Sequence, residues 1–156
     1  MRKKMTAKKW TVVALIICLI SLIGTSFVQT SNQKIKIKSM KWESPQGNLL
    51  SADLWIPQNA TADTPAPCII TAEGWYNNKE MQDMYNVELS RRGYVVLTLD
   101  MHGHGNSEAV SSDRLYEGAV GVDAAVQLAA TLPYVDVEKI GVTGHSSGGT
   151  AANMAV

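Results

Sequence analysis

A serine near the end of the chain stands in a pattern that supports nucleophilic chemistry. The motif G-x-S-x-G is matched by Gly144-His145-Ser146-Ser147-Gly148. In this motif the serine lies at a strained turn from a strand into a helix, and the two glycines let the backbone segments on either side approach each other. The register is fixed, because a motif centred on Ser147 would need a glycine where His145 stands. We therefore predict that Ser146 is a nucleophile and that Gly144 and Gly148 shape its turn.

The flanking sequence supports this interpretation over its main rival. A short apolar run, "KIGVTG", precedes the serine, and a run of small residues, "GGTAANMA", follows it. A helix that starts after the serine would direct its N-terminus at the site, where the Ser147 N–H could stabilise an oxyanion. The rival is a glycine-rich phosphate loop, which is disfavoured because neither G-K-[ST] nor G-x-G-x-x-G is present.

The elements that must position this serine alternate along the chain. Residues 35–44 and 49–57 read as the two strands of a hairpin, joined by the turn "PQGN". Strands are then predicted at 68–74, 94–100 and 139–146, and helices at 79–93, at 115–133 and from 147 onward. The first helix carries a row of apolar residues at helical spacing: Met81, Met84, Tyr85 and Leu89. This order predicts an α/β fold with a mostly parallel sheet and helices on both faces.

Three blocks of sequence carry a family resemblance. "ITAEGWYN" matches a strand-end turn, "LTLDMHGHGNSE" is similar to D-x-R-G-x-G-x-S, and "VDVEKIGVTGHSSGG" contains the serine motif. Together they resemble the N-terminal half of an α/β-hydrolase, the fold of many esterases, lipases and serine peptidases. The resemblance covers residues from about 35 to 156.

The resemblance assigns roles to particular positions. It implies that Ser146 is the nucleophile and that the backbone N–H groups of Ser147 and Trp75 form the oxyanion hole. Glu73 stands where the family usually has histidine, and His102 stands where it often has arginine. A charged Glu73 pointing into the oxyanion hole would hinder it, so we expect this side chain to point away or to be hydrogen-bonded.

The remaining members of a catalytic triad are not evident in the chain. Its histidines are His102, His104 and His145, and none is expected to serve as the base. In the family the order along the chain is Ser, then Asp or Glu, then His. Both partners would then follow Val156, so the chain is expected to be an N-terminal fragment of a hydrolase.

The N-terminal region predicts contact with a membrane. Residues 1–9 form a basic tail, residues 10–28 are uncharged and apolar, residues 29–38 form a polar linker, and residues 39–156 form the partial hydrolase domain. The apolar run is long enough to cross a bilayer core of about 30 Å, which favours an uncleaved signal anchor. A cleaved signal peptide is the alternative, with a secreted product. The short tail favours an extracytoplasmic hydrolase domain.

The predicted function is hydrolysis of an ester, thioester or amide through an acyl-enzyme on Ser146. Two alternatives remain open: an inactive membrane-anchored remnant, and an acyltransferase that uses the same serine. The substrate would be a small molecule or a peptide. No cofactor or metal is implied, and because basic residues cluster around the apolar run rather than on the domain, nucleic-acid binding is not indicated.

Overall fold

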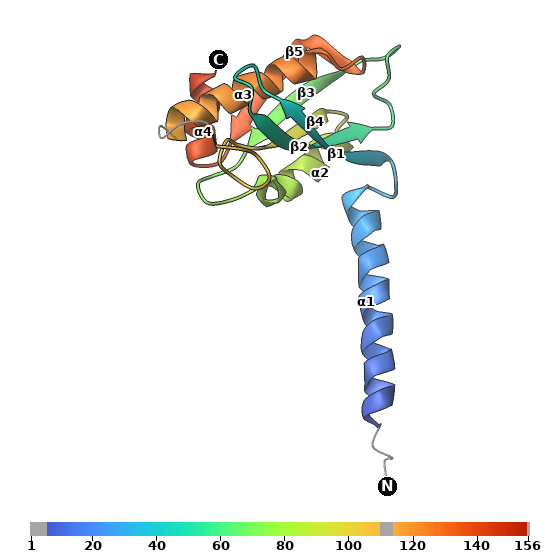
Figure 1. The fold of residues 1–156 in the computed structure, drawn as a ribbon. Helices are drawn as coiled ribbons and strands as arrows, with labels where there is room; N and C mark the ends of the chain where they lie inside the picture. Colours follow the sequence, from blue (N-terminus) through green and yellow to red (C-terminus); the bar gives the residue numbers. More distant parts are fainter. Residues whose placement is uncertain (1–5, 110–113, 156) are drawn as a thin grey trace.

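The computed structural model describes residues 6–109 and 114–155. An N-terminal helix, α1, extends away from a domain in which a sheet lies between helices (Figure 1). The helices are α1 (Ala7–Gln29), the 3-10 turn η1 (Lys79–Gln82), α2 (Asp83–Arg91), α3 (Arg114–Ala130) and α4 (Ser147–Met154). The strands are β1 (Ile35–Glu43), β2 (Leu49–Pro57), β3 (Ala66–Ala72), β4 (Val95–Asp100) and β5 (Val135–Gly144).

The sheet has five strands in the order β1-β2-β4-β3-β5. The β1–β2 hairpin and the β2–β4 pair are antiparallel, whereas β4, β3 and β5 run parallel. The predicted mostly parallel sheet with helices on both faces is therefore confirmed. Because the carboxyl ends of parallel strands lie at one edge, the residues that follow β3, β4 and β5 come together there.

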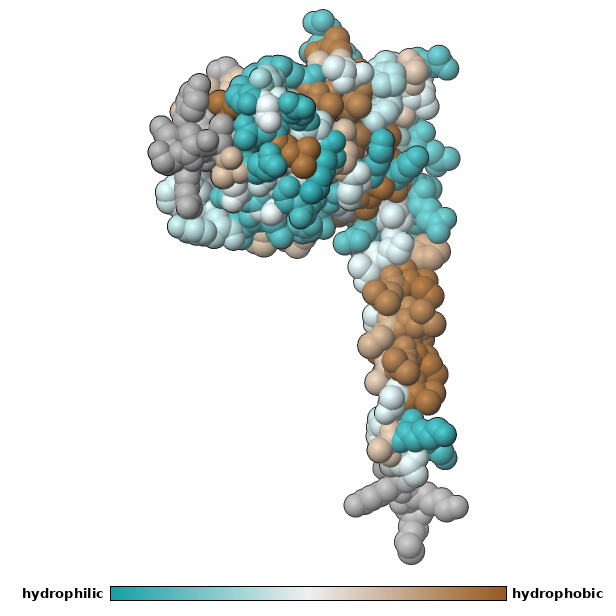
Figure 2. All heavy atoms as spheres, in the orientation of Figure 1, coloured by the Kyte–Doolittle hydropathy of each residue, from teal (hydrophilic) through white to brown (hydrophobic). Residues whose placement is uncertain are grey.

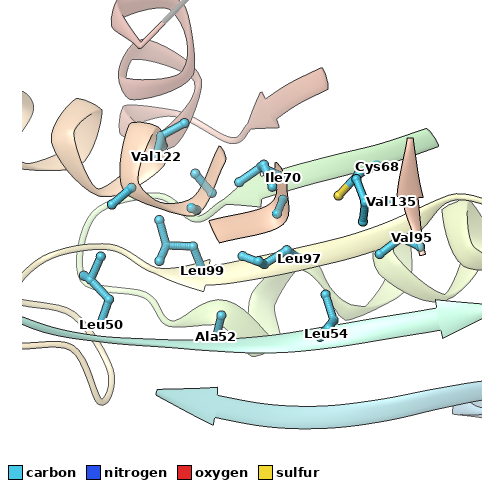
Figure 3. Close-up of a cluster of buried hydrophobic side chains, with 14 of the residues drawn as sticks. Leu50, Ala52, Leu54, Cys68, Ile70, Val95, Leu97, Leu99, Val122 and Val135 are labelled. Atoms are coloured by element: carbon cyan, nitrogen blue, oxygen red, sulfur yellow. The ribbon is translucent and has the colours of Figure 1, made fainter. Parts of the chain in front are cut away.

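One face of the sheet is apolar over its central strands. Alternate residues of the central strands point to this face, as the two-residue period of a strand requires. They include Leu54 of β2, Ile70 of β3 and Leu97 of β4, each no more than 1% exposed (Figure 3). Small residues of α3 and α4, such as Ala125 and Ala151, cover this face. The small side chains let both helices pack closely on the strands.

The opposite face is mainly polar where α2 covers it. Thr71 donates its hydroxyl hydrogen bond to Asn86 Oδ1 at 2.9 Å, and both side chains are buried. Asp100 accepts hydrogen bonds from the Lys79 N–H at 2.8 Å and from Lys79 Nζ at 3.0 Å. Burying these groups is tolerated because each has a partner. A small apolar cluster of Ile35, Trp55 and Val96 completes this face.

The predicted helix over 79–93 is observed, although its first turn is the 3-10 turn η1. Three of the four residues of its apolar row do not face the sheet, whereas the fourth, Leu89, packs against the apolar cluster that contains Trp55 and Val96. Met81, Met84 and Tyr85 are 57%, 77% and 61% exposed, while the polar side chains of Gln82 and Asn86 are buried. The orientation of α2 therefore rests on the hydrogen bonds of the polar face together with the packing of Val87 and Leu89, and not on the whole apolar row.

Helix α1 has no buried residue, and its apolar surface forms the brown band in Figure 2. Among the described residues it is the one helix long and apolar enough to cross a membrane. It can therefore serve as a membrane anchor or as a signal sequence. The predicted linker is shorter than expected, because β1 begins at Ile35 and pairs with β2 from its first residue.

Candidate active site

The backbone at Ser146 has the strained geometry that the sequence motif predicts. Its dihedral angles are φ 55° and ψ −120°, a conformation that a residue with a side chain rarely adopts. β5 ends at Gly144 and α4 begins at Ser147, so the strained residue occupies the turn between strand and helix. Thr150 N–H donates to the Ser146 carbonyl at 3.2 Å, which joins the turn to the first turn of α4.

The two predicted glycines are required by close backbone contacts. A Cβ atom on Gly144 would lie 2.3 Å from the carbonyl carbon of Gly148. A Cβ on Gly148 would lie 2.3 Å from the Glu73 carbonyl oxygen and 2.4 Å from that of Ala72. Real Cβ atoms do not approach this closely, so any larger residue would displace the turn.

These contacts also place the turn against the carboxyl end of β3. His145 N–H donates to the Ala72 carbonyl at 3.1 Å. At Gly74, which follows β3 closely, a Cβ would lie 3.4 Å from the Cβ of Ser146. The Gly74 turn and the serine therefore meet although more than seventy positions separate them in the sequence.

The predicted oxyanion donors lie in the two segments that meet here. Ser147 is the first residue of α4, and Trp75 directly follows Gly74. In the described part of the chain, neither backbone N–H has a hydrogen-bond partner. A cavity of about 10 Å³ is lined in part by Trp75, His104 and Ser147, which is room for about one water molecule. Residues of both segments thus line the same small space.

Glu73 is buried and hydrogen-bonded, as expected. Its Oε1 accepts a hydrogen bond from the Met101 N–H at 3.0 Å and lies 2.9 Å from His104 Nδ1. Burial raises the pKa of this carboxyl, and the contacts with Met101 and His104 oppose that shift. The side chain therefore joins the end of β3 to the loop after β4. Sequence reasoning did not identify this pairing, because its partners lie 28 and 31 positions away.

None of the three histidines contacts the Ser146 hydroxyl among the described residues. His104 is held by Glu73, and His102 is buried beside the small cavity. The His145 side chain lines a different cavity, of about 380 Å³, together with Gln82 and Tyr85. Within the described ranges no cluster of His, Cys, Asp or Glu is arranged to hold a metal ion.

The fold and the strained serine define the class of the protein, an α/β-hydrolase. A family model for the X-Pro dipeptidyl-peptidase (S15 family) matches residues 46–156. The chain therefore belongs to this peptidase family, and its ancestry is that of a hydrolase. No curated protein sequence matches it.

Solved structures agree with the class. A hypothetical protein from Pseudomonas aeruginosa is 29% identical with a TM-score of 0.67, over 78% of this chain and 39% of its own. Est1E from Butyrivibrio proteoclasticus, solved with ferulic acid, is 29% identical with a TM-score of 0.63. The match covers 74% of this chain and 46% of Est1E. Dipeptidyl peptidase 4 from Porphyromonas gingivalis shares the fold, at 21% identity and a TM-score of 0.65. The match covers 78% of this chain and 19% of the peptidase. The chain thus spans less than half of each of these proteins.

Proposed function

We propose that Ser146 is the nucleophile of a membrane-anchored serine hydrolase that acts on an ester, thioester or amide. The observation that carries the proposal is the backbone of Ser146, which is strained at φ 55° directly against the Gly74 turn. Strain of this kind persists only where the surrounding structure enforces it, and it is concentrated at functional sites. Membership of a hydrolase family supports the same role.

In the proposed reaction the Ser146 hydroxyl oxygen attacks the acyl carbon of the substrate. The negative charge that develops on the acyl oxygen is stabilised by the N–H groups of Ser147 and Trp75. A histidine takes the serine proton and passes it to the leaving alcohol, thiol or amine. Water then attacks the acyl-enzyme, releases the acid and restores the serine hydroxyl.

The histidine and its orienting acid are proposed to come from polypeptide outside these 156 residues. Two observations support this: no described histidine contacts Ser146, and the related structures are more than twice as long as the region they share with the chain. For the 156 residues alone, the same observations favour the second candidate, an inactive membrane-attached protein. Without a base the hydroxyl of Ser146 is a weak nucleophile.

A fluorophosphonate probe separates these two candidates. If the 156-residue chain lacks a base, its labelling should be slow, and rapid stoichiometric labelling would show that the chain supplies a base itself. In a longer form that carries the histidine, peptide mapping should place the label on Ser146. The Ser146→Ala variant should lose it, whereas Thr150→Ala, an exposed hydroxyl one turn later on α4, should keep it. Labelling that survives Ser146→Ala would refute the nucleophile.

The chemical class of substrate needs a separate comparison. The family name indicates a peptide with proline in the second position, while Est1E was solved with ferulic acid, a carboxylic acid of the kind that ester hydrolysis releases. Turnover of an alanyl-prolyl nitroanilide and of nitrophenyl acetate should be measured on the same longer form. Cleavage of the ester alone would assign an esterase, and efficient release of nitroaniline would assign a peptidase. An acyltransferase would instead transfer the acyl group to an added alcohol.

A membrane anchor is the proposed role of α1, with the hydrolase domain outside the cytoplasm. The helix spans 23 residues without a buried side chain, which fits a segment surrounded by lipid. Extraction by alkaline carbonate tests the anchor, because a cleaved signal peptide would release the domain. Protection from protease in sealed vesicles tests the side on which the domain lies.

A further inference from the structure

A group of exposed apolar side chains remains that the proposed reaction does not use. It consists of residues on η1, on α2 and on the turn that follows β3, and we call it the apolar face: Trp75, Tyr76, Met81, Met84 and Tyr85. Their exposed fractions range from 47% for Trp75 to 82% for Tyr76. The rings of Trp75 and Tyr76 contact each other edge to face, 6.1 Å apart. Clustered exposure of this kind in a folded domain marks an interaction surface.

The position of this face relative to α1 is fixed by direct bonds. Arg91 Nη2, at the end of α2, donates to the Val28 carbonyl at 3.0 Å. Ile35 N–H donates to the Thr30 carbonyl at 2.9 Å, so β1 begins one tight turn after α1. Because Val28 is the last residue of the apolar run, Arg91 marks the level of the membrane surface beside α2.

The apolar face points toward that surface. α2 lies on the side of the sheet from which α1 extends, level with the end of α1 (Figure 1). Asn86 and Ser90 of α2 are turned to the sheet and buried, so Met84 and Tyr85 are turned away from it. The outward face of α2 therefore faces in the direction in which α1 runs.

The charges around the face are compatible with a bilayer surface. A cavity of about 370 Å³ at the junction with α1 is lined in part by Lys34 and Arg91, whose cationic groups can reach lipid phosphates. Glu88 pairs with Arg91 and Arg92, so its carboxylate is offset by cations, whereas Glu80 shares Lys79 with Asp100. Tryptophan and tyrosine are the residues that favour the headgroup region of a membrane.

We propose that the apolar face rests in the headgroup region of the membrane that α1 crosses. There the side chains of the apolar face would move from water into the headgroup region. Helix α3, on the far side of the sheet, would remain in water. The inference depends on α1 being a membrane anchor. It further implies, if Ser146 is the nucleophile, that the site receives amphiphilic acyl substrates from the bilayer, because Trp75 belongs both to this face and to the oxyanion turn.

A fluorescent label whose emission is quenched by nitroxide on lipid headgroups tests the contact. The full chain is placed in phosphatidylcholine–phosphatidylglycerol vesicles with the label on a single cysteine. Met84→Cys in a Cys18→Ser background places it on the apolar face, and Ala130→Cys in the same background places it on the exposed end of α3. Cys68 is buried, and burial raises the pKa of its thiol to about 12, so it is not expected to react.

We expect the label at position 84 to lose most of its fluorescence and the label at position 130 to keep it. The unmodified chain labelled at Cys18, within α1, reports insertion separately through nitroxides on the acyl chains. A quenched Cys18 label with an unquenched label at position 84 overturns the proposal while leaving the anchor intact. Loss of fluorescence at 84 in vesicles without nitroxide, reversed as protein is diluted into lipid, is self-quenching between two copies on this face and also overturns the proposal. The serine assignment is unaffected by any of these results.

Discussion

The two faces of the sheet bury their helices in opposite ways. On the face that α3 and α4 cover, apolar strand residues pack against small residues of the helices, such as Ala125 and Ala151. The contact there is van der Waals packing of complementary shapes. On the α2 face, Thr71 and Asp100 bond to the polar side chains of Asn86 and Lys79. Met84 and Tyr85 of the helix are turned outward. The comparison shows that hydrogen-bonded polar side chains can help to orient a helix even when apolar residues such as Met84 stay exposed.

The largest expected effect comes from breaking the polar face. Asp100→Ala leaves the Lys79 ammonium, with only 5% of its side chain exposed, without its closest buried partner. Unfolding free energy should fall by about 3–5 kcal/mol. Urea denaturation of the full chain in detergent measures it. Glu80→Ala removes the exposed partner of the same lysine and should cost about 1 kcal/mol or less. Equal losses for both variants would mean that this ion pair does not act as a buried one.

Overpacking tests the opposite face. A Cβ on Gly118 would lie 3.1 Å from the Ala151 Cβ and 3.3 Å from Met101 Sδ, so Gly118→Val must separate α3 from α4. We expect a loss of about 1–3 kcal/mol. Ala130→Val, on the exposed end of the same helix, should change stability by about 0.5 kcal/mol or less. If Gly118→Val is neutral in urea denaturation, the contact between the helices is looser than described.

The pH dependence of stability reports how well water is excluded from the buried core around Cys68. Burial raises the pKa of the Cys68 thiol from 9.0 to about 12. The unfolded chain therefore releases this proton first, and the folded state loses stability as pH rises from 9 toward 12. At one pH unit above the unfolded pKa the loss should be about 1.4 kcal/mol. The same pH series on Cys68→Ala should lack this component, and identical slopes would contradict it.

The smallest effect is expected on the outward side of α2. Met84 is 77% exposed, so Met84→Gln should change the free energy of unfolding by no more than about 0.5 kcal/mol, as measured by urea denaturation in detergent. Leu54→Ala, in the apolar core, should cost about 2–5 kcal/mol and shows that the assay responds. A large loss for Met84→Gln would place this side chain in a folded contact rather than at a free surface.

Much of the fold follows from local patterns that act over a few residues. The two-residue period of β1, the short apolar run of β4, the longer apolar run of α1 and the turn glycines are all visible in the sequence and give the order of elements. The site prediction reached Ser146, Gly144 and Gly148 because the elbow is a local steric device. A Cβ atom on either glycine would lie 2.3 Å from backbone atoms in the structure, while the catalytic roles of Ser146, Ser147 and Trp75 stay predictions.

The sequence by itself therefore determined the elements, the strained serine turn and the apolar length of α1, because each depends on neighbouring residues. Only the tertiary structure decided which side of α2 is buried, how Glu73 is held by His104 and Met101, and where the domain lies relative to α1. These depend on hydrogen bonds between residues such as Thr71 and Asn86, or Val28 and Arg91. No local period encodes such a partner, because the chain must first fold back to bring the two groups together.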